Sequence, residues 1–251
     1  MSLMHIERSA DVAVIRMRGG KGNAMSTAFL ADLAQAVADV EASDARGVVF
    51  IGENGFFSAG LAPPELIEME RPALRTFIDS FGVAMRRVLA CPLPTVAAID
   101  GHAIAGGTVL ALKCDARLAA AGPAKLGLRE VQLGIGLPAA VVEPLRLRVP
   151  PSSFTTVALE GALFGPDRAK ELGIVDEVVA PGELLPRALA RASELGKAPR
   201  AAYAQIKASL SRPAIEAIDR HDDAEREKWL DTWFGAEAQR LLRDAVSRLK
   251  K

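Results

Sequence analysis

Apolar positions in the first 180 residues follow two alternating patterns. Short runs rich in β-branched residues predict strands, and longer segments with apolar residues three and four apart predict helices. The predicted strands are residues 12–17, 46–52, 95–100, 115–121, 124–128 and 174–179. The predicted helices are residues 27–43, 71–89, 106–113, 138–149, 151–161 and 166–173. This alternation is typical of an α/β fold.

The pattern changes near the C-terminal end of the chain. From Glu183 onward it is helical only, and Pro199 and Pro213 are predicted to interrupt the helices. We therefore expect an α/β core over residues 1–182 and a helical region over residues 183–251.

Aromatic residues at helical spacing mark the last part of the helical region. Trp229, Trp233 and Phe234 fall on one side of a predicted helix. A helix this apolar on one side needs a partner, and its own core and another subunit both qualify.

Composition and charge exclude several classes of protein. The chain has 251 residues, half of them hydrophobic, which is enough for a large core. Its 31 Lys and Arg balance 31 Asp and Glu, so no basic excess is available for nucleic acid. The longest apolar stretch, residues 103–112, is too short to span a bilayer, and no charged-then-apolar leader opens the sequence. These features predict a cytoplasmic protein that binds neither nucleic acid nor membrane.

Residue types that commonly bind metals are few and scattered. Cys91 and Cys114 lack metal-ligand spacing, and they suggest buried thiols in a reducing compartment. The three histidines form no cluster in the sequence: His5, His102 and His221. We expect no metal site.

Two glycine-containing turns share one shape. Residues 56–61, "FFSAGL", and residues 101–107, "GHAIAGG", each follow a strand, and the second opens an apolar helix. A helix start leaves backbone N–H groups unpaired and adds partial positive charge, so it favours anions. Two such turns facing each other would form an oxyanion hole. Tight packing alone also explains a pair of glycines, so the turns by themselves define no function.

Five ordered blocks resemble the crotonase family, the enoyl-CoA hydratase/isomerase superfamily. They are "FFSAGL" near residue 60, "PLPTVAAIDGHAIAGG" at 92–107, "CDARLAA" at 114–120, "LREVQLGIGLP" at 128–138 and "RAKELGIVDEVV" at 168–179. The resemblance implies a spiral of ββα units with a helical C-terminal region that assembles trimers or dimers of trimers. It also implies an acyl-CoA substrate, with coenzyme A part of that substrate and no other cofactor.

The resemblance carries specific roles to residues of this chain. The thioester oxygen is expected between the N–H groups of Leu61 and Gly106. The hydratase branch uses two glutamates, and this chain has Val109 at the first of those positions and Glu130 at the second. Arg129 stands where the family commonly has proline.

One carboxylate suits isomerisation better than hydration. Adding water across a double bond needs a group that activates the water and a proton for the neighbouring carbon, and Val109 supplies neither. Moving a double bond needs only one carboxylate, Glu130, to take a proton from C2 and return it to C4. An apolar neighbour such as Val109 also raises the pKa of a carboxylate by desolvation. The sequence thus favours an enoyl-CoA isomerase. A hydratase using Glu130 with another acid and a catalytically weak CoA-thioester-binding protein remain the alternatives.

Further candidates surround this site. Glu143 lies in an otherwise apolar segment and is a possible second acid, although a solvated glutamate at a helix end is equally consistent with its position. The resemblance places coenzyme A near Ala24 and Ala59, with Lys21 or Arg18 available to the phosphates. The segment around residues 134–144 differs from that of hydratases and predicts an apolar acyl pocket.

Overall fold

Nine strands form two parallel-rich sheets in the part of the chain that the structure describes. The computed structural model describes residues 2–249, and for residues 221–223 and 249 the backbone only. The larger sheet has the order β1-β2-β3-β5-β7-β9 and the smaller one the order β4-β6-β8. The strands are β1 (Met4–Ser9), β2 (Val12–Met17), β3 (Gly47–Ile51), β4 (Phe56–Ser58), β5 (Thr95–Ile99), β6 (His102–Ile104), β7 (Ala116–Ala120), β8 (Leu126–Gly127) and β9 (Glu177–Val179). Only β1 and β2 pair in antiparallel fashion.

The chain visits both sheets in each turn of a spiral. β3, β5 and β7 enter the larger sheet, and the strand after each of them, β4, β6 or β8, enters the smaller one. A helix follows before the next turn begins. These are the ββα units that the resemblance to the crotonase family predicted.

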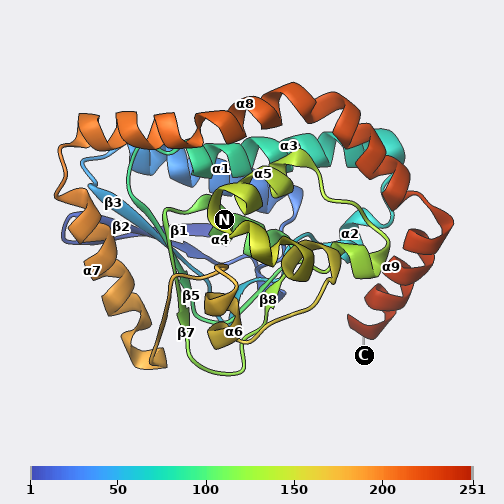
Figure 1. Ribbon diagram of the computed structural model, residues 1–251, viewed down its shortest axis with the longest axis horizontal. Helices are drawn as coiled ribbons and strands as arrows, with labels where there is room; N and C mark the ends of the chain where they lie inside the picture. Colours follow the sequence, from blue (N-terminus) through green and yellow to red (C-terminus); the bar gives the residue numbers. More distant parts are fainter. Residues whose placement is uncertain (1, 250–251) are drawn as a thin grey trace.

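Helices cover both faces of the larger sheet. The helices of the described chain are α1 (Thr27–Ala42), α2 (Pro63–Leu66), α3 (Arg71–Ala90), α4 (Gly106–Lys113), α5 (Ala139–Arg148), α6 (Pro166–Glu171), α7 (Leu184–Gly196), α8 (Arg200–Trp233) and α9 (Ala236–Leu249). In Figure 1, α7 lies against the strands, while α8 runs along α3 and also packs against α5. Every residue of the central strands β3, β5 and β7 is buried, as expected for parallel strands covered on both faces.

Tertiary contacts explain where the predicted elements and the structure differ. The predicted break at Pro213 is wrong, because α8 continues through that proline. Beyond it, Ala214 and Ile218 are buried in a cluster with Leu89 and Ala139 of the core, and this packing sustains the helix. The segment 151–161 is helical but not α-helical, since a 3₁₀ turn is followed by a π turn.

The first strand was not predicted. β1 reads "MHIERS", and only its first residue is fully buried. Its pattern therefore carries little of the apolar signal that marks a strand. The expected division at residues 182/183 falls between β9 and α7 and stays a prediction.

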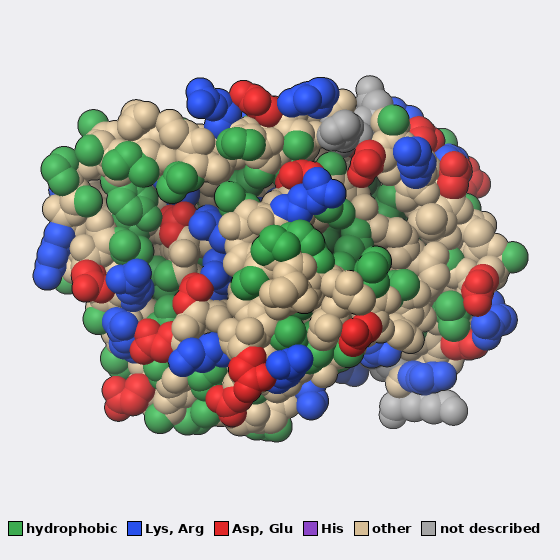
Figure 2. Space-filling view, in the orientation of Figure 1, with side chains coloured by type: hydrophobic (Ala, Val, Ile, Leu, Met, Phe, Trp, Pro, Cys, Tyr) green, Lys and Arg blue, Asp and Glu red, His purple; other side chains and the backbone are tan. Residues whose placement is uncertain are grey.

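Surface charge agrees with the balanced composition. In Figure 2, Lys and Arg side chains alternate with Asp and Glu on the visible face and form no basic patch there. Within the described residues, no helix is both long and apolar enough to cross a membrane.

Candidate active site

The two glycine turns meet at the carboxyl ends of β4 and β6. These strands pair in parallel, so the turns that follow them lie side by side. A methyl group added at Gly60 would lie 2.7 Å from the Gly106 nitrogen, and one added at Gly106 would lie 3.4 Å from the Leu61 nitrogen. Neither the Leu61 nor the Gly106 N–H has an acceptor among the residues that the structure describes. Two unpaired amides thus stand within a few ångströms of each other.

Close approach explains the residue types in these turns. Gly60 has φ +83°, a conformation that side chains rarely allow. At Gly107 an added methyl group would lie 2.1 Å from the Ser58 carbonyl oxygen. Ala105 caps α4 at φ 51° and is held there at both ends, because its N–H donates to Gly127 O at 2.8 Å and its carbonyl accepts from Val109 N at 3.0 Å.

Side-chain hydrogen bonds fix both turns. Asn23 donates from Nδ2 to Phe56 O at 3.1 Å, and Ser58 donates from Oγ to Asn23 O at 2.8 Å. In the second turn, the buried Thr108 donates from Oγ1 to Ala103 O at 2.6 Å and accepts from Gly127 N at 2.9 Å. The two amides are therefore rigidly placed before any ligand binds.

A cavity of about 410 Å³ opens beside these amides. Ala59 and Leu61 line it from the first turn, and Gly106 and Val109 from the start of α4. Glu130 completes the group from η2 (Glu130–Leu133), the 3₁₀ turn that follows β8. The structure thus brings together five of the residues that the sequence singled out.

Glu130 is a carboxylate in an apolar setting. Its Oε2 atom is buried and has no hydrogen-bond partner within the described part of the chain. Burial raises the pKa of Glu130 to about 7, although backbone N–H groups around it act in the opposite direction. A carboxyl group with this pKa exchanges a proton readily near neutral pH, as an acid/base catalyst must.

Other predicted residues lie outside the cavity lining. Ala24 and Lys21 belong to the segment that hydrogen bonds attach to the first turn, where Ala59 N donates to Gly22 O at 2.8 Å. Lys21 is exposed. Arg18 forms an ion pair with Glu53 at 2.9 Å, so its charge is already engaged.

Glu143 differs from Glu130 in its surroundings. It lies on α5, is not among the described residues that line the cavity, and pairs with Arg146 at 3.6 Å. Asp244 of α9 is a cavity-lining carboxylate that sequence reasoning missed. Its side chain is 55% exposed and pairs with Arg240.

The C-terminal helices form the far wall of the cavity. Trp229 and Trp233 are buried in this subunit, and their rings stand 5.3 Å apart. Both line the cavity together with Leu242 of α9. Their spacing in the sequence indicated an apolar face, and the structure shows that the chain's own core covers it.

No cluster of three or more metal-binding side chains occurs among the residues that the structure describes. His5 lies on β1 of the larger sheet and His102 on β6 of the smaller one, and the side chain of His221 lies outside the described residues. Cys91 and Cys114 are buried thiols whose pKa values burial raises.

Comparison with known proteins identifies the class to which this fold and site belong. Residues 7–240 match the family model described as enoyl-CoA hydratase/isomerase. The chain belongs to this family, as its sequence blocks predicted.

Individual relatives divide between the two activities. Human mitochondrial enoyl-CoA delta isomerase 1 is 28% identical over 252 residues, which cover 99% of this chain and 83% of the relative. A putative enoyl-CoA hydratase of Thermus thermophilus is 34% identical over 203 residues, covering 78% of each chain. The crystal structure of human mitochondrial delta3-delta2-enoyl-CoA isomerase matches with a TM-score of 0.94 at 28% identity, covering 99% of this chain and 98% of that one.

Proposed function

We propose that the protein is an enoyl-CoA isomerase that moves a double bond from the 3 to the 2 position of an acyl-CoA. The observation that carries this proposal is the placement of Glu130. A buried carboxylate oxygen and two amides, all without a partner among the described residues, share one cavity, and Val109 stands at the position of the other hydratase glutamate.

The reaction follows from this placement. The thioester oxygen accepts hydrogen bonds from the N–H groups of Leu61 and Gly106. The Glu130 carboxylate removes a proton from C2, and the electrons of that C–H bond delocalise into a dienolate that the amides stabilise. Glu130 then returns the proton at C4, which leaves the double bond between C2 and C3. The cycle consumes no water and uses no cofactor besides the coenzyme A of the substrate.

The site favours a substrate with an apolar acyl group. Val109, Trp229 and Trp233 surround the space beyond the amides and Glu130. Ala24, Ala59 and Lys21 remain our proposed contacts for the coenzyme A moiety, at the entrance formed by the first turn. Glu143 remains only a candidate second acid, and its ion pair with Arg146 weakens that role.

A hydratase is the second candidate, because Asp244 supplies a further carboxylate in the same cavity. Its exposure and its pairing with Arg240 make it a poor match for a water-activating base. Catalytically weak binding of CoA thioesters is the candidate from another class of protein.

Substrate assays separate these candidates. Purified protein is given 3-enoyl-CoA and 2-enoyl-CoA in turn, and formation or loss of the conjugated thioester is followed by its ultraviolet absorbance. Isomerisation with little hydration supports the proposal. Predominant hydration that Asp244→Asn abolishes supports the hydratase, and tight acyl-CoA binding without turnover of either substrate supports the binding protein.

Assembly is a separate proposal. We propose a homotrimer or a dimer of trimers in the cytoplasm, on the strength of the family resemblance. Sedimentation equilibrium of the purified chain measures the mass directly, and a monomer at micromolar concentration would contradict this expectation.

A further inference from the structure

A fully buried lysine lies behind the acyl cavity. Lys113 ends α4 and has no exposed surface. Its Nζ donates to Ala140 O at 2.7 Å, and no acidic partner is recorded for it among the described residues. Burial lowers the pKa of Lys113 to about 7. Because ammonium and amine both carry N–H groups, the hydrogen bond survives in either protonation state.

The acceptor of this bond is an unusual carbonyl. Ala140 lies in the first turn of α5, and its oxygen would ordinarily accept from the N–H of the residue four positions later. That residue is Pro144, which sits inside the helix and has no N–H. Ala140 is half-buried, and a carbonyl shielded from water and left without a donor costs free energy. Lys113, on a neighbouring helix, supplies the missing donor.

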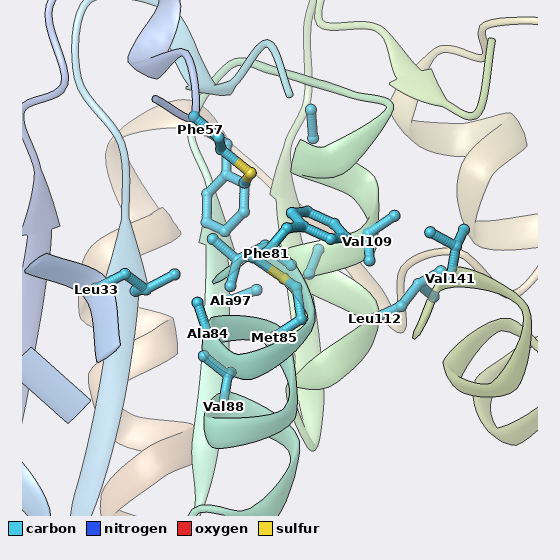
Figure 3. Packing of buried hydrophobic residues seen from close by; sticks show 14 of the residues in the cluster. Leu33, Phe57, Phe81, Ala84, Met85, Val88, Ala97, Val109, Leu112 and Val141 are labelled. Atoms are coloured by element: carbon cyan, nitrogen blue, oxygen red, sulfur yellow. The ribbon is translucent and has the colours of Figure 1, made fainter. Parts of the chain in front are cut away.

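We infer that Lys113 is a positioning residue that replaces the N–H missing at Pro144 and thereby holds α5 against α4 as a wall of the acyl cavity. The intervening residue Val141 lines the cavity, as does Val109, one helical turn before Lys113. In Figure 3, Val141 lies beside Leu112 and across from Val109. The lysine thus fixes the contact between α4 and α5 at which Val109 and Val141 face each other. That this wall bounds an acyl group rests on the proposed function, whereas the coupling of Lys113 to Pro144 does not.

A double-mutant cycle tests the coupling. Lys113→Met removes the donor and keeps the aliphatic stem, and Pro144→Ala restores a backbone N–H four residues after Ala140. We expect Lys113→Met to lower the thermal midpoint by roughly 3–6 °C more in the wild-type background than in the Pro144→Ala background. The desolvation of the buried amine is lost in both backgrounds and cancels in this difference.

A matched control uses the other interior proline. Pro213→Ala restores an N–H inside α8, next to Ala214, which packs on Ala139 of α5. It gives the Ala140 carbonyl no new donor, so the effect of Lys113→Met should stay unchanged. If Lys113→Met alone does not fold, the Lys113→Met/Pro144→Ala protein should still fold. Equal effects of Lys113→Met in the wild-type and Pro144→Ala backgrounds, or failure of the double variant to fold, would overturn the inference.

Kinetics test the effect on the cavity. With enoyl-CoA substrates long enough to reach Val141, we expect Lys113→Met to raise KM roughly tenfold and to change kcat less than twofold. The added Pro144→Ala substitution should return KM toward the wild-type value. A uniform loss of kcat for short and long substrates, without a change of KM, would show a loss of folded protein instead and would contradict the positioning role. Activity retained by Glu130→Gln would refute the proposed isomerase mechanism without affecting the stability cycle.

Discussion

Glu130 and Glu143 place the same residue type in different surroundings on two neighbouring segments. Glu130 stands at the start of η2, where the chain leaves β8, and one of its oxygens is buried without a partner among the described residues. Glu143 stands on α5 and pairs with Arg146 at 3.6 Å. Burial disfavours the charged form of Glu130 and raises its pKa to about 7. The comparison teaches that the surroundings, and not the residue type, distinguish the proposed acid/base from a carboxylate in an ion pair.

Removing each carboxylate in turn gives the largest expected contrast. Glu130→Gln should lower kcat for 3-enoyl-CoA about 10³-fold, because the other carboxylate among the described lining residues, Asp244, is exposed and paired with Arg240. Glu143→Gln should leave kcat within about twofold. Isomerase assays at saturating substrate, with acyl-CoA affinity measured by calorimetry as a control for folding, decide the matter. A similar loss in both variants would refute the distinction.

The N–H groups of Leu61 and Gly106 lie in the same cavity as Glu130 and can be tested separately. Gly60→Ala puts a methyl group 2.7 Å from the Gly106 nitrogen, at a position with φ +83°. Displacing one oxyanion donor costs about 3 kcal/mol of barrier, so kcat should fall roughly 10²-fold. Gly20→Ala is the matched control, because Gly20 also has positive φ but has open space around it. Equal activity of the two variants would argue against a role for the amides.

How far the sequence predicts this site depends on the range of the interactions. The two glycine turns were recognisable because each follows a predicted strand, whereas Glu130 was singled out only because the block "LREVQLGIGLP" resembles the crotonase family. The far wall was not, since the spacing of Trp229 and Trp233 shows an apolar face but not what covers it. The contact between Lys113 and Ala140 joins residues 27 positions apart and leaves no local pattern. The expectation that Pro213 would interrupt the helix was wrong, because packing of α8 outweighed the intrinsic cost of a proline inside a helix.

The pH dependence of kcat/KM tests the raised pKa of Glu130. The pKa of Glu130 is raised to about 7 from an ordinary 4.5, and the base is the ionised form. We expect kcat/KM to rise roughly tenfold per pH unit below this pKa and to level off above it. A plateau that extends down to pH 5 would contradict the raised pKa.

The free energy of unfolding also depends on pH through Glu130, but it falls over the pH range in which the activity rises. The folded protein keeps the Glu130 proton between pH 4.5 and about 7, where the unfolded chain loses it. Glu130 therefore stabilises the fold most below pH 4.5, and this contribution is lost as the pH rises through 7. Chemical denaturation should show that the free energy of unfolding declines more steeply with pH over this window in the wild-type protein than in Glu130→Gln.

A glutamate placed at Val109 restores the other hydratase acid and should produce a gain of function. Val109→Glu places a carboxylate in the cavity opposite Glu130, and hydration of 2-enoyl-CoA should rise about tenfold over background. Val109→Gln has nearly the same shape without the charge and should give no gain. If neither variant hydrates the substrate, the missing glutamate is not what separates this site from a hydratase.

The smallest expected effect concerns the ion pair of Glu143. Its partner Arg146 has a side chain that is 64% exposed, and solvent screening makes such pairs weak. Replacing Arg146 with Ala should change the free energy of unfolding by at most about 0.5 kcal/mol and leave kcat unchanged. The informative outcome is the activity of Arg146→Ala in the Glu130→Gln background. If freeing Glu143 from its partner restores turnover there, the ion pair is what keeps Glu143 from acting. If turnover stays lost, Glu143 is excluded by its position, as its place outside the described cavity lining indicates.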